Sequence, residues 1–108
     1  MATDGIPDLK TLTTEQAQAR LDDLFVRPND AGPDVELHLI GVEKLPRDPR
    51  AKEQDGDRPF SLLFRGPHDP VLTQGMHDLE NEALPLRGLF LVPVGREEDG
   101  YRYEAVFT

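Results

Sequence analysis

The sequence contains three histidines, and these with their neighbouring carboxylates are the first residues that could do chemistry. His68-Asp69 and His77-Asp78 repeat one dipeptide, and His38 stands in an apolar run. Zinc sites usually place paired ligands one helical turn or one tight turn apart, and these histidines lack that spacing. In a strand, His77 and Asp78 would point to opposite faces and could not bind one ion together. We therefore expect no metal site and no cofactor.

Other catalytic patterns are missing as well. The sequence has no cysteine and one serine, Ser61, which has no Gly-x-Ser-x-Gly elbow around it. The acidic run at residues 53–57 has its glycine at the fourth position, whereas a calcium loop of the EF-hand type needs glycine at the sixth. We expect no enzymatic activity. The alternative is a small-ligand-binding or hydrolytic mini-barrel with an open mouth that gathers His68, Asp69, His77 and Glu80.

The composition indicates one acidic domain over residues 1–108, with 12 basic and 21 acidic side chains and a net charge of -9. Residues 1–43 carry 3 basic and 9 acidic side chains, residues 60–108 carry 4 and 8, and residues 44–59 carry 5 and 4. An acidic body disfavours nucleic acid and anionic membranes as partners. The first residues lack the pattern of a signal peptide, so we expect a cytoplasmic protein.

The first predicted element is a helix over residues 13–22. Thr13 is placed as its N-cap and Gln16 as the capping-box partner. Residues 24–27 continue the helical apolar stripe but equally suit a strand, so the pattern leaves both open. Residues 35–42 alternate as a strand until Ile40-Gly41, where we expect a bulge or a bend.

The second half is predicted to be rich in strands. A mobile charged loop over residues 44–59 precedes the motif-bearing β region, residues 60–108. In that region we expect a strand at 60–64, another at 75–80, a central strand at 87–94 and a last one at 101–107, the last two joined by a loop at 95–100. The fold class is therefore mainly β, a small antiparallel barrel or roll of five to six strands with one short N-terminal helix.

Six aromatic side chains fall in the predicted strands, and we expect them to form the core rather than a stacking surface for bases. They are Phe60, Phe64, Phe90, Tyr101, Tyr103 and Phe107.

Several segments resemble a family of small bacterial domains of unknown function. They are residues 60–67 (FSLLFRGP), 74–75 (QG), 88–95 (GLFLVPVG) and 103–107 (YEAVF). The family pattern differs at Thr73, His77 and Asn81, where it has proline, an aromatic residue and histidine. The resemblance covers residues 60–108 well and 13–26 loosely. It implies no activity, but similar proteins are encoded beside fibre proteins of the phage-tail-collar type.

The leading hypothesis is therefore a non-catalytic structural or protein-interaction module, an accessory or assembly partner of phage-tail-like fibre proteins. Exposed strand edges or the basic loop would contact the partner. The sequence leaves the oligomeric state open. The candidate interaction residues are Lys44, Arg47, Arg50, Lys52, Arg65 and Gln74.

Overall fold

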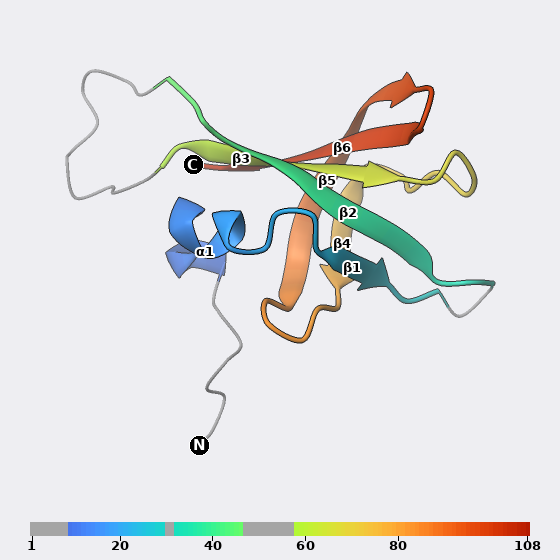
Figure 1. Cartoon of the computed structure of the whole chain (residues 1–108), viewed down its shortest axis with the longest axis horizontal. Helices are drawn as coiled ribbons and strands as arrows, with labels where there is room; N and C mark the ends of the chain where they lie inside the picture. Colours follow the sequence, from blue (N-terminus) through green and yellow to red (C-terminus); the bar gives the residue numbers. More distant parts are fainter. Residues whose placement is uncertain (1–8, 30–31, 47–57) are drawn as a thin grey trace.

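The structure is a computed structural model that describes residues 9–29, 32–46 and 58–108. Six antiparallel strands form a nearly closed barrel, with a 3-10 turn and a short helix at the N-terminal end (Figure 1). The predicted fold class is confirmed. The elements are η1 (Leu9–Thr11), α1 (Thr14–Gln18), β1 (Leu24–Arg27), β2 (Val35–Lys44), β3 (Phe60–Gly66), β4 (Gly75–Leu79), β5 (Leu86–Glu97) and β6 (Gly100–Phe107).

The strands are hydrogen-bonded in the order β1-β2-β3-β6-β5-β4. The two outer strands meet at one antiparallel bridge, between Val26 of β1 and Glu80, the residue that directly follows β4. Their N–H groups donate to each other's carbonyl oxygens at 2.9 and 2.7 Å. This bridge closes the barrel at one point. The prediction that residues 87–94 form the central strand is wrong, because β5 lies between β6 and β4 while β3 and β6 occupy the middle of the order.

The N-terminal helix has the predicted cap but is shorter than the predicted 13–22. Gln16 N–H donates to Thr13 Oγ1 (3.1 Å) and Thr13 N–H to Gln16 Oε1 (3.0 Å), which completes the capping box. After a turn, Asp22 takes a left-handed φ of 71° and its N–H donates to Leu39 O at 2.7 Å. The chain thus leaves the helix to join β2. Residues 24–27 form strand β1, which settles the open alternative.

The inner faces of the strands follow the predicted alternation, and the bulge expected near Gly41 is present. A second register shift lies between Pro93 and Gly95. Residues from all six strands, the N-terminal segment and two loops form one core. Its largest fully buried side chains are Tyr103, Phe25, Phe60, Phe64, Leu12, Leu37, Leu39, Leu62, Leu79, Leu86, Leu89 and Leu91.

One aromatic side chain is placed against the prediction. Phe90 is 48% exposed on the outer face of β5, while Leu89 and Leu91 on either side are buried. Every residue in this run is apolar, so its alternation could not show which face points inward. The predicted loop at 95–100 is also shorter than expected, because β5 continues to Glu97 and pairs it with Gly100.

The ends of the predicted loop at 44–59 are ordered, while residues 47–57 lie outside the described part of the chain. Leu45 N–H donates to Pro59 O at 3.0 Å. The guanidinium of Arg58 donates to Leu9 O and Leu12 O, and its carbon lies 5.5 Å from the ring centre of Phe60. Arg58 therefore ties the N-terminal segment to the barrel. Among the described residues, no helix has the length and apolar character needed to cross a membrane.

Candidate interaction surfaces

The predicted interaction residues do not form one surface. Lys44 ends β2 opposite Phe60, at the start of β3, whereas Arg65 lies near the other end of β3. Gln74 is exposed in the bend before β4. The other three predicted residues, Arg47, Arg50 and Lys52, lie outside the described residues. Of the described ones, Arg65 lines a surface hollow.

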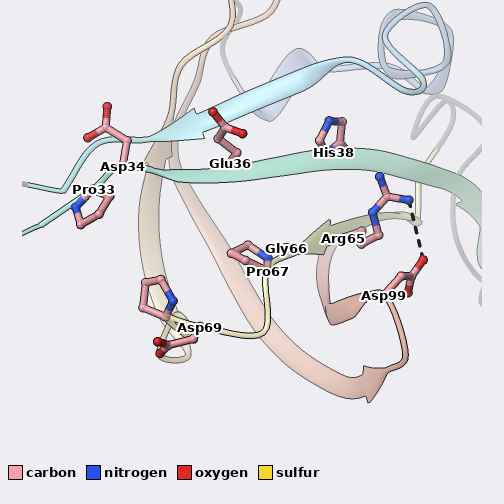
Figure 2. A pocket seen from close by; sticks show the side chains of 10 residues that line it. Pro33, Asp34, Glu36, His38, Arg65, Gly66, Pro67, Asp69 and Asp99 are labelled. Atoms are coloured by element: carbon pink, nitrogen blue, oxygen red, sulfur yellow. Dashed lines mark ion pairs between the residues drawn. The ribbon is translucent and has the colours of Figure 1, made fainter.

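This charged hollow, of about 420 Å³, lies on the outside of β2 and β3, against the loop that follows β3 (Figure 2). Prolines 33, 67 and 70 contribute to its walls. Glu36 and His38 stand on β2, Arg65 lies near the end of β3, and Asp99 reaches in from the tip of the β5–β6 hairpin (Figure 2). The charged and titratable side chains in its lining are Asp34, Glu36, His38, Arg65, Asp69 and Asp99.

Basic side chains form a row beside the hollow. His38 pairs in register with Arg65, and Arg65 with Arg102 on β6. Like charges directly opposite each other destabilise a sheet. The Asp99 carboxylate offsets this repulsion, since it lies 2.8 Å from Arg102 Nη2 and 3.8 Å from Arg65 Nη1. The hydrogen bond from Arg102 holds the pKa of Asp99 below its ordinary value, so Asp99 serves as a fixed negative charge.

The Asp99 contacts predict a pH dependence of stability. The folded-state pKa of Asp99 lies below the ordinary 3.8, so the stability it contributes is present above pH 3.8 and is lost as the pH falls through the folded value. We expect the urea midpoint of wild type to exceed that of Asp99→Asn at neutral pH. The difference should shrink in acid. A difference that stays constant into strong acid would contradict this role for Asp99.

The residues of the predicted mini-barrel mouth do not converge. Asp69 lines the charged hollow, whereas His77 lines a second hollow beside β4. His68 Nε2 lies 2.8 Å from the carbonyl oxygen of Glu97 and so fastens the β3–β4 loop to β5. Glu80 forms the backbone bridge to Val26. Within the described ranges, no three potential ligands among His, Asp and Glu are placed to hold one metal ion.

The side chain of His77 instead holds two parts of the fold together through hydrogen bonds. It is buried, and its Nδ1 accepts from Arg27 Nε at 3.1 Å. Because the guanidinium can only donate, the imidazole proton must sit on Nε2, which donates to Thr73 O at 2.8 Å. His77 therefore joins β1 to the bend before β4. As predicted, Asp78 points to the opposite face, where its carboxylate accepts from Gly88 N–H.

A second surface is the outer apolar patch, defined here as Met76 and Phe90. Met76 on β4 and Phe90 on β5 are partners in register, and they are 69% and 48% exposed. Two neighbouring strands thus present large apolar side chains to solvent at one cross-strand pair.

Sequence reasoning missed the functional candidates Arg27, Met76, Phe90 and Asp99. Met76 had a usable signal, because it precedes His77 in a strand and must face the opposite side. The pairing of Arg27 with His77 and of Asp99 with Arg65 joins residues far apart in the chain. No local pattern announces such contacts.

The chain matches one known protein family over almost the whole barrel. Residues 12–107 match the family DUF6916, described as a domain of unknown function. The chain belongs to the DUF6916 family. The matched region begins at Leu12 and ends at Phe107, both buried in the core. The DUF6916 match therefore spans the barrel and includes both surfaces described above. No curated protein and no solved structure matches the chain.

Proposed function

We propose that this protein is a non-catalytic protein-interaction module that binds its partner through the outer apolar patch. The observation that carries the proposal is the exposed cross-strand pair Met76↔Phe90. Apolar side chains that neighbour one another on an outer sheet face mark an interaction site, whereas single exposed ones do not. Large apolar and aromatic side chains are also the residues that contribute most to binding at interfaces.

A non-catalytic role suits the charged hollow better than catalysis does. Asp99 has a lowered pKa and is held by two arginines, which makes it a poor proton carrier near neutral pH. Ser61 is buried on β3, away from the lining of the hollow. A hydrolase built on this hollow would lack a positioned nucleophile among its described residues.

We further propose that the partner is a phage-tail-like fibre protein. Support for this partner comes from the resemblance of residues 60–108 to domains encoded beside fibre proteins of the phage-tail-collar type. The role would be accessory, in assembly or attachment of the fibre.

The test uses a photo-crosslinking amino acid at position 90 in the native host, with position 21 as the matched control. Leu21 is also apolar and 41% exposed, but it lies in the turn between α1 and β1. We expect crosslinking to one stoichiometric protein from position 90 only. With that partner purified, Phe90→Glu should weaken binding by about tenfold or more, as for a residue central to an interface, and Leu21→Glu should not.

The outcomes test the interaction surface and the identity of the partner separately. Equal crosslinking from positions 90 and 21, or no loss of affinity in Phe90→Glu, would refute the interaction surface. A specific partner other than a fibre protein would keep the interaction module and remove the fibre assignment.

A further inference from the structure

The seam between β1 and β4 is closed at one bridge and open beside it. In the described part of the chain, Val26↔Glu80 is the one backbone pair that links these strands. In an antiparallel ladder the next hydrogen-bonded pair would join residues 28 and 78. Residue 28 is a proline, which has no N–H to donate, and its carbonyl oxygen accepts from Arg27 Nη1 at 2.8 Å. The ladder therefore stops at Val26.

Strand β4 continues past this point with its edge facing the opening. Glu80 directs its N–H and C=O to β1, so alternation directs the backbone groups of Asp78 and Met76 to the same side. The irregularity between His77 and Leu79 places the extra residue on β5, which leaves the alternation of β4 intact. A hollow of about 390 Å³ lies along this edge, lined by Arg27, Pro28, Met76, His77 and Asp78.

The two faces of this edge differ in chemistry. On the outer face stands the exposed Met76, next to Phe90. On the inner side lies the guanidinium of Arg27, with Nε bonded to His77 and Nη1 to Pro28. Its remaining N–H groups can bond a carboxylate. A strand laid against β4 would thus meet an apolar surface on one face and a cation on the other.

We propose that the open edge of β4 binds an extended segment of the partner protein as an added β-strand. This inference rests on the proposed function and names its binding mode. The segment pairs with the backbone of Met76 and Asp78, places apolar side chains against Met76 and Phe90, and presents an Asp or Glu carboxylate to Arg27. Main-chain hydrogen bonds then provide affinity, and the alternating side chains provide specificity.

Hydrogen exchange of the free protein tests the open edge directly. The amides of Met76 and Asp78 should exchange at least about tenfold faster than those of His77 and Leu79, which face β5. Equal protection of all four amides would overturn the inference, because the edge would then already be paired.

Peptide selection tests the binding mode. The probe is a phage-displayed library of random dodecapeptides, panned on the full-length protein. We expect enriched peptides with apolar residues at alternate positions and an acidic residue between them, and we expect the bound peptide to slow exchange of the Met76 and Asp78 amides. Arg27→Gln should remove the acidic preference. Enrichment of no such pattern, or unchanged exchange of these amides, would count against strand addition.

A matched pair of variants separates the backbone from the side chain. Proline is tolerated at an edge position whose N–H faces outward, so Met76→Pro should fold but lose one donor to the added strand. We expect Met76→Pro to bind the selected peptides at least about tenfold more weakly than Met76→Ala, in line with the loss of a central contact. Equal affinity would overturn the inference. If the crosslinked partner is lost by Phe90→Glu but retained by Met76→Pro, the interaction module stands and strand addition fails.

Discussion

Replacing Gly100 by alanine is expected to lower the free energy of unfolding by about 2–6 kcal/mol. Gly100 has a φ of +132°, a region that L side chains rarely adopt, and this strain accounts for about 1–3 kcal/mol. An added Cβ would also lie 2.0 Å from Gly66 O, a backbone atom that cannot rotate away. Forcing the two strands apart accounts for about 1–3 kcal/mol more.

The Gly100 variant should also disturb the charged hollow. The close approach of Gly100 to Gly66 holds the hairpin tip against the end of β3, where Asp99 reaches both Arg65 and Arg102. Thermal unfolding followed by circular dichroism measures the loss, with a midpoint expected to fall by about 8–48 °C at about 4–8 °C per kcal/mol.

Gly88→Ala is the matched control for Gly100→Ala. Gly88 also has a positive φ, +65°, but no atom lies within 4 Å of its added Cβ. This variant should lose only about 1–2 kcal/mol, from the left-handed backbone. Equal losses in the two variants would show that the contact with Gly66 does not matter.

Phe25→Ala is expected to destabilise the protein by about 3–5 kcal/mol, the usual range for a buried phenylalanine. Phe25 is fully buried, and its ring meets Phe64 edge-on at 5.6 Å between centroids. Strand β1 has four residues and is paired along one side only, apart from the bridge to Glu80. The phenyl ring is thus the main anchor of β1 in the core.

Urea unfolding of Phe25→Ala should be compared with that of Leu24→Ala. Leu24 is the neighbouring residue on the same strand, but it points outward and is 39% exposed. Its truncation should change stability by no more than about 0.5 kcal/mol. Similar losses in both variants would contradict the assignment of faces on β1. A large loss of stability in Phe25→Ala alone would confirm that the buried ring of Phe25 anchors β1 to the core.

The sequence predicted those features that depend on neighbouring residues. The Thr13 capping box needs only residues three apart, and the alternation of β6 gave its inner face correctly. The bulge near Gly41 followed from broken alternation. The register shift after Pro93 suits a residue that has no N–H to donate to the ladder. The predicted helix, residues 13–22, is too long. Its last residue, Asp22, instead donates its N–H to Leu39 O on β2, a contact between distant parts of the chain that the local pattern does not contain.

The candidate surfaces depended on contacts that no local pattern specifies. Arg65, named as an interaction residue from the sequence, lines the charged hollow, but its ion-pair partner Asp99 comes from the tip of another hairpin. The prediction that Phe90 lies in the core is wrong. In a run of apolar residues, the alternation does not show which side chains point inward. The pairing of β5 with β4 and β6 fixes which of its side chains point inward. Leu89 and Leu91 are buried, and Phe90 between them points outward.

The sequence by itself determined an acidic and mainly β chain, since its charge, its turns and the period-two alternation of its strands are properties of short segments. Only the tertiary structure decided the strand order, the bridge between β1 and β4 and the open edge beside it. Val26 and Glu80 meet because the sheet curls until its two outer strands touch. That closure depends on the packing of the whole core, and Pro28 then limits how far it extends.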